Sequence, residues 1–205
     1  MHHNIKHHII AVSCIVCVLF SGCAKSPDNE LAQTKEAIKA AIDAEADKYM
    51  AKNFENVHKG LQAAEAEIAK QKNSFFLSRK YTGAIQLLKK TEVLAKEIAR
   101  EAPGAKQNMA ETVRNNISLS DELIKITANN IKKSSAFKNK HLITALKEEL
   151  KTAENAAASA AADFKAGDIL SASNNISHFQ VLITQITDKI HSGSTTVQFN
   201  EAEVR

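Results

Sequence analysis

Apolar residues recur at helical spacing along almost the whole chain between residues 31 and 190, and little interrupts them. The 205 residues include only two prolines, six glycines and no tryptophan. Residues three or four apart share one face of an α-helix, so each such run gives a helix whose apolar stripe needs a packing partner. The pattern therefore predicts an all-α protein, an antiparallel helical bundle or a short array of helical hairpins with five or six helices.

Six helices with short connections account for the pattern. Their predicted ranges are about 28–51, 54–72, 79–101, 105–133, 138–165 and 168–191. Ser26 and Pro27 favour a helix start at residue 28, and Pro103-Gly104 predicts a stop between the third and fourth helices. The expected organisation is an N-terminal helical hairpin region at 28–104, a C-terminal helical region at 105–191 and a flexible tail at 192–205.

Two features of the second half leave questions open. On the fourth helix Leu119, Leu123 and Ile126 form a second apolar face, which predicts contacts with neighbours on two sides. The halves have helices of similar length, so the chain is either a duplication or an array of helices that resemble each other by chance.

All three cysteines lie near the N-terminus, and two of them fall inside a run without charges. Cys14 and Cys17 belong to residues 9–20, which follow the polar stretch "MHHNIKHH" with its cationic Lys6. This order is typical of a secretory signal, and the run is shorter than the roughly 20 residues that a membrane-spanning helix needs. We therefore expect residues 1–22 to be a signal peptide, in which Cys14 and Cys17 are small apolar residues and not a redox or metal pair.

Cys23 closes the stretch "LFSGC", which resembles the signal of bacterial lipoproteins. The resemblance implies cleavage before Cys23 and acylation of its thiol, with residues 23–27 as a lipidated tether. Two or more acyl chains give stable membrane anchoring. Because Ala24 and not aspartate follows the cysteine, the resemblance implies the periplasmic face of the outer membrane. An uncleaved anchor, or a plain signal peptide with a chance cysteine, is the alternative.

The charge and the cysteine content restrict what the chain can do after cleavage. The formal net charge of the full chain is +4, and acidic and basic residues are interspersed along it. Such a mixed surface is typical of a solvated protein face and excludes a nucleic-acid partner. Without a free cysteine beyond Cys23, the fold must be held by packing and not by a disulfide.

The stretch from "AIKAAIDAEADKYMAKNFENVHKG" to "SRKYTGAIQLLKKTEVLAKEI" resembles the alanine-rich helical domain of unknown function found in bacterial lipoproteins. The pattern of that domain is matched by Ala46, Tyr49, Tyr81 and Ala84, and the resemblance covers about residues 30–101. It shares its spacing with tetratricopeptide-like hairpins. It implies a helical fold and an envelope location, and it supplies no catalytic residue.

One pair of residues has the spacing of a metal site. Glu55 and His58 form an E-x-x-H, the motif by which one helix of a di-iron protein supplies two ligands, and Asp188 with His191 is a looser relative. A di-iron site needs a second E-x-x-H and two more inward-facing glutamates on separate helices, and the second E-x-x-H is missing from the chain. Because Val57 is expected in the core, Glu55 and His58 should face outward, and we predict no metal, cofactor or catalytic residue.

The remaining histidines of the mature chain, His141 and His178, are isolated, and we expect them to be surface residues. Neither a G-x-S-x-G motif nor a glycine-rich phosphate loop occurs, so we do not expect an enzyme.

Two functions from different classes remain. The first is a non-catalytic, lipid-anchored periplasmic envelope protein with a structural or protein–protein interaction role, whose partner is an envelope protein or peptidoglycan. The alternative is a carrier of a small ligand or metal in a cavity of the bundle, with Glu55 and His58 as its candidate anchors. The apolar, alanine-rich stripes favour the first, because ligand pockets need convergent polar groups.

Overall fold

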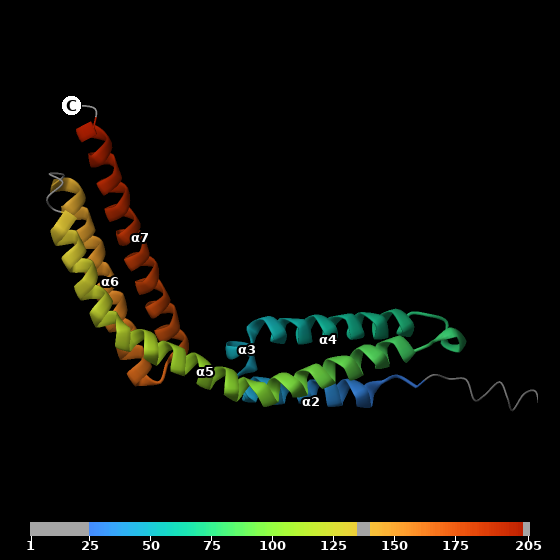
Figure 1. Cartoon of the computed structure of the whole chain (residues 1–205). Coiled ribbons are helices and arrows are strands. Elements are labelled where there is room, and N and C mark those ends of the chain that lie inside the picture. Colours follow the sequence, from blue (N-terminus) through green and yellow to red (C-terminus); the bar gives the residue numbers. More distant parts are fainter. Residues whose placement is uncertain (1–24, 135–139, 203–205) are drawn as a thin grey trace, which may run out of the picture. The chain divides into compact units, whose positions relative to one another are not determined.

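The computed structural model describes residues 25–134 and 140–202 (Figure 1). The elements are α2 (Asp28–Asp43), α3 (Ala46–Tyr49), α4 (Ala51–Lys72), a 3₁₀ turn η2 (Phe76–Ser78), α5 (Thr82–Ser134), α6 (Lys140–Ala166) and α7 (Ile169–Ala202). No strand occurs in these two ranges, so the all-α prediction is confirmed. The predicted signal peptide and Cys23 lie outside the described residues.

The first predicted helix, 28–51, is wrong as one continuous element. It is divided into α2 and α3 by Glu45, which adopts the left-handed conformation with φ 60°. The Glu45 amide donates a hydrogen bond to the carbonyl of Ile42 at 2.8 Å, which closes the last turn of α2. Lys48 Nζ donates to Glu45 Oε1 at 2.9 Å, and this bond raises the pKa of the Lys48 ammonium. Left-handed helix ends usually carry glycine, so no sequence signal marked this one.

The predicted stop at Pro103-Gly104 is also wrong, because α5 contains Pro103 in its interior. Proline removes one backbone donor and costs about 3 kcal/mol within a helix. Buried Ile98 and Ala102 on one side of it, and buried Val113 on the other, give packing that offsets this cost. The chain divides into two compact units between Pro103 and Gly104, and each unit is described separately below.

The last predicted helix ends too early. α7 continues to Ala202, whereas the sequence led us to expect a flexible tail from residue 192. A single glycine within a helix costs only about 1 kcal/mol, so Gly193 alone does not end it.

In unit 1, which ends at Pro103, α2 and α4 pack against the first part of α5 (Figure 1). One end of the core joins α2, α3, α4 and α5 through apolar side chains that include Ala41, Ala46, Phe54, Val57 and Ile98. The other end is formed by Ala64, Ile68, Tyr81, Ala84 and Leu88, with Leu31 packed against them. The start of α2 therefore lies beside the end of α4 and the start of α5.

A glycine sets the spacing of α4 and α5 inside unit 1. A Cβ atom at Gly60 would overlap the hydroxyl of Thr91, which donates to the carbonyl of Leu87 at 2.8 Å. The absence of a side chain at Gly60 is thus what allows α4 and α5 to lie this close.

On the surface of unit 1, Lys35 Nζ on α2 and Glu65 Oε1 on α4 form an ion pair at 2.8 Å.

In unit 2, which begins at Gly104, the rest of α5 packs with α6 and α7. The core of this unit alternates small and large side chains, namely Val113, Ile131, Leu146, Leu150, Ala153, Ala156, Ala157, Ala160, Ala172, Ile176, Phe179 and Ile186. Between α6 and α7 the chain turns at Gly167, whose φ is +84°, and Asp168 Oδ1 accepts from the Ser171 amide at 3.0 Å as the cap of α7.

The predicted second contact face on the fourth helix is wrong in two of its three positions. Leu119 and Ile126 are 52% and 48% exposed, and only Leu123 packs against the core. Leu119 and Ile126 have the right spacing, but none of the helices described in unit 2 covers them.

We expect Gly60→Ala to destabilise the protein, because overpacking at a close helix contact costs about 1–3 kcal/mol. The better helix propensity of alanine returns at most about 1 kcal/mol. Gly83→Ala is the matched control, since a Cβ atom there meets only Glu67 Cγ at 4.0 Å. The measurement is the free energy of unfolding in denaturant.

The double variant Gly60→Ala/Thr91→Ala should regain part of the loss, because it removes the overlapping hydroxyl. Equal stability of Gly60→Ala and Gly83→Ala would contradict this account of the α4–α5 spacing.

Candidate functional site

Cys23 itself is not described, but the structure shows how soon the fold begins after it. Pro27 is fully buried, and its carbonyl accepts from the Leu31 amide at 3.0 Å. Ser26 Oγ donates to Asp28 Oδ1 at 2.8 Å. Only residues 24–26 separate Cys23 from the first buried side chain, so a group attached to Cys23 would stay close to unit 1.

The E-x-x-H pair lies on the outer face of α4. Lys59 Nζ contacts Glu55 Oε1 at 2.6 Å, and this hydrogen bond, followed by the attraction between the two charges, lowers the pKa of the Glu55 carboxyl. The His58 ring meets the edge of Phe54 with 4.9 Å between ring centroids. Both Glu55 and His58 are exposed, whereas Val57 is buried. Glu55 is thus paired with a lysine and not with a second metal-ligating side chain.

The other histidines considered from the sequence are also exposed: His141 lies on α6, and His178 and His191 lie on α7. Asp188, the partner in the looser motif, is exposed as well. Among the described residues, no group of three or more histidine, cysteine, aspartate or glutamate side chains is arranged to hold a metal ion. The structure therefore does not bring the sequence-derived candidates together.

Unit 2 contains a groove between α5 and α6 that sequence reasoning missed. It has a volume of about 340 Å³ and is lined by Ala128, Ile131, Lys132, Ile143, Lys147 and Leu150. Apolar walls with two lysines suit a short apolar group that carries a negative charge. Ile131 and Leu150 are buried core residues, and nothing in the sequence indicated that a groove lies beside them.

Large exposed apolar side chains are concentrated in two places. On α5, Leu119 and Ile126 are seven residues apart and so share one helix face. In the connection between α4 and α5, Phe75, Phe76 and Leu77 are 65%, 51% and 57% exposed. The sequence analysis predicted only that a helix ends at 72 and the next begins at 79, although three consecutive large apolar residues lie between them.

No helix in the described residues is both long enough and apolar enough to cross a membrane. Comparison with protein-family models, with curated proteins and with solved structures finds no match for this chain.

Proposed function

We propose that this chain is a non-catalytic, lipid-anchored protein of the bacterial envelope, held by acyl chains on Cys23 at the periplasmic face of the outer membrane. Its role is structural or in protein–protein interaction. The observation that supports this most directly is the short distance in sequence between Cys23 and the buried Pro27. An extended chain spans roughly 3.3–3.6 Å per residue, so Pro27 stays within about 14 Å of Cys23.

The interior of each unit supports a role at the surface and not in a buried site. Buried side chains are apolar or small. Four of the five buried hydroxyls in the described residues, those of Thr34, Thr91, Ser120 and Ser134, donate to backbone carbonyls of their own helices. These polar groups are therefore already used within the fold. A helical body of this kind engages other molecules through its exposed faces.

The exposed face of Leu119 and Ile126 on α5 is the best candidate for contact with a partner. Its side chains are aliphatic and lie two helical turns apart, the pattern by which one amphipathic helix meets another. Peptidoglycan would require polar groups that hydrogen-bond sugar hydroxyls. We therefore propose an envelope protein as the partner, in preference to peptidoglycan.

The second candidate is a small-ligand carrier, and the groove between α5 and α6 favours it. Its volume of about 340 Å³ lies near the lower end of the range of ligand pockets. Lys132 and Lys147 at this groove would select an anionic amphiphile and not a metal ion. Glu55 and His58, the anchors expected from the sequence, lie in unit 1, so they have no part in this groove.

Replacing Cys23 by serine should abolish acylation, because serine has no thiol for the lipid to join. We expect Cys23→Ser to accumulate at the size of the uncleaved precursor and to lose the acyl mass, measured by cell fractionation and mass spectrometry of the intact protein. Cys17→Ser is the control and should be processed as the unchanged chain is. Normal processing and membrane retention of Cys23→Ser would contradict the proposal.

A photoreactive amino acid in place of Leu119 should crosslink the partner in cells, because the exposed α5 face would lie within contact distance. The control position is Val93, which is 65% exposed on the part of α5 in unit 1. Adding Ile126→Asp should remove the crosslink, since a carboxylate would be buried in an apolar contact. Equal crosslinking at positions 119 and 93, or a crosslink to lipid alone, would count against a protein partner.

A further inference from the structure

We propose that the connection between α4 and α5 inserts Phe75, Phe76 and Leu77 into the headgroup region of the membrane that holds Cys23. We call these three residues the apolar tip. The proposal deepens the proposed function and rests on its lipid anchor. It assigns a second, noncovalent membrane contact to unit 1, with an anionic phospholipid surface as its ligand.

The exposure of the apolar tip is unusual within unit 1. Its three side chains are consecutive, large and more than half exposed, whereas the neighbouring Tyr81, Ala84 and Leu88 are buried. The rings of Phe75 and Phe76 lie edge to face with their centroids 4.9 Å apart. A contiguous exposed apolar patch of this kind marks an interaction or membrane site.

Hydrogen bonds hold the tip in a defined shape. Arg79 Nε donates to the carbonyl of Ser74 at 3.1 Å, and its guanidinium also donates to the carbonyl of Lys72 at 2.8 Å. The Lys80 amide donates to Gln71 Oε1 at 2.9 Å, which fastens the end of the loop to α4. The apolar side chains are thus presented by an ordered turn, so little additional ordering is needed when they enter a membrane.

The residues around the tip carry positive charge. We call Lys70, Lys72, Arg79 and Lys80 the basic collar. No acidic residue lies between Glu67 and Glu92 in the sequence, and Glu67 itself pairs with Lys70 at 3.7 Å. The first turn of α2 carries Asp28 and Glu30. Aromatic and leucine side chains surrounded by lysine and arginine are typical of segments that lie in the interface of an anionic bilayer. This charge pattern is why we propose a lipid surface and not a second copy of the chain.

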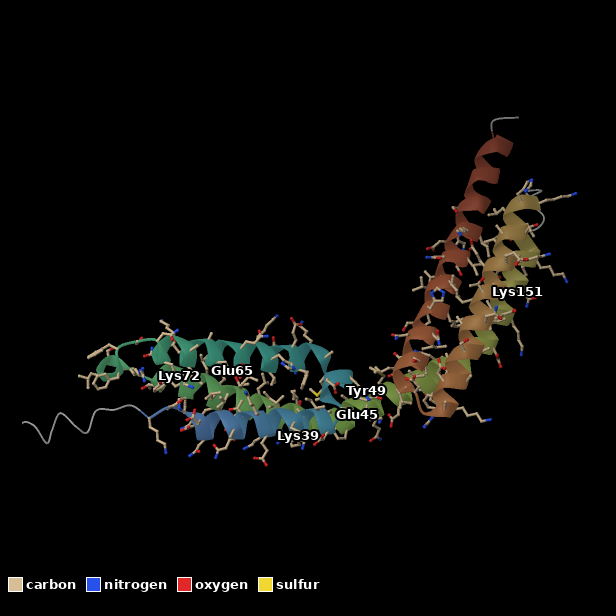
Figure 2. All side chains as sticks on the ribbon, turned by 180° about the vertical axis from the view of Figure 1, so that it is seen from behind. Lys39, Glu45, Tyr49, Glu65, Lys72 and Lys151 are labelled. Carbon is tan, nitrogen blue, oxygen red and sulfur yellow. The ribbon has the colours of Figure 1, made fainter. Side chains whose placement is uncertain are left out.

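The apolar tip lies at the end of unit 1 where α2 begins. Leu31 on α2 packs against the core cluster that Ala64 and Ile68 of α4 form with Tyr81, Ala84 and Leu88, so α2, α4 and the start of α5 meet at one end of unit 1. Figure 1 shows the blue start of α2 at the same end as the loop between α4 and α5. In Figure 2, Lys72 lies at this end, whereas Glu45 and Tyr49 lie at the opposite end of unit 1.

Cys23 precedes Lys25, the first described residue, by only two positions. Acyl chains on Cys23 would therefore bring the apolar tip to the bilayer surface. Because the anchor already holds the chain at the bilayer, the apolar tip meets the lipid at a high effective concentration. Its own affinity for the bilayer can therefore be weak.

The test uses the acylated full chain reconstituted in vesicles of phosphatidylethanolamine and phosphatidylglycerol. The chain contains no tryptophan, so Phe76→Trp introduces a single fluorescent reporter into an exposed position. We expect its emission to shift to shorter wavelength in vesicles and to be quenched by brominated acyl chains. Val93→Trp, a position of equal exposure to Phe75 within the same unit, is the control and should show neither effect.

Adding Lys72→Gln and Lys80→Gln to Phe76→Trp should weaken the quenching. Vesicles of neutral lipid should also weaken the quenching of Phe76→Trp when its basic collar is unchanged. Equal quenching at positions 76 and 93, or a short-wavelength emission that needs no lipid, would overturn the proposal. The second outcome would mean that another segment of the chain or a second copy covers the tip. The two proposals are tested separately. A wrong lipid anchor shows as a missing acyl mass on Cys23, whereas a wrong membrane contact of the apolar tip shows in the fluorescence of the tryptophan at position 76.

Discussion

The arrangement of unit 1 depends on the packing of Leu31 on α2 against the core cluster of Ala64, Ile68, Tyr81, Ala84 and Leu88. This packing fixes the first turn of α2 to the hairpin formed by α4 and α5, and so it defines which end of the unit receives the chain from Cys23. Thr34 strengthens the same contact, because its hydroxyl lies 3.2 Å from the carbonyl of Leu88 on α5. Without these contacts, an anchor at Cys23 would bear no fixed relation to the apolar tip.

Small residues allow this packing in both units. Gly60 admits Thr91 between α4 and α5, and buried Ala153, Ala157 and Ala160 admit the neighbouring helices in unit 2. The exposed features of the described residues are the apolar tip, the Leu119 and Ile126 face of α5 and the groove between α5 and α6.

The fold class followed from the sequence because helical periodicity is a property of each segment alone. Val57 was correctly expected in the core on the same grounds. The predictions that were wrong concern where helices break or continue, and helical periodicity does not determine this. Glu45 is left-handed without a glycine signal, and the packing on both sides of Pro103 keeps α5 continuous.

The candidate sites were less predictable than the fold. An E-x-x-H motif drew attention to Glu55, but the ion pair with Lys59 became visible only in the structure. Periodicity placed Leu119 and Ile126 against a neighbour, and none of the helices described in unit 2 covers them. The apolar tip could be read in the sequence as three consecutive large apolar residues. Its position beside the start of α2 could not, because that position depends on how three helices pack.

The most direct test of the account is to find which lysines lie near Lys25. A short amine-reactive crosslinker applied to the acylated chain, followed by mass spectrometry, reports this without any substitution. The account predicts links from Lys25 to Lys72 or Lys80, which lie at the same end of unit 1. Links from Lys25 to Lys48 or Lys52, at the opposite end, would contradict it.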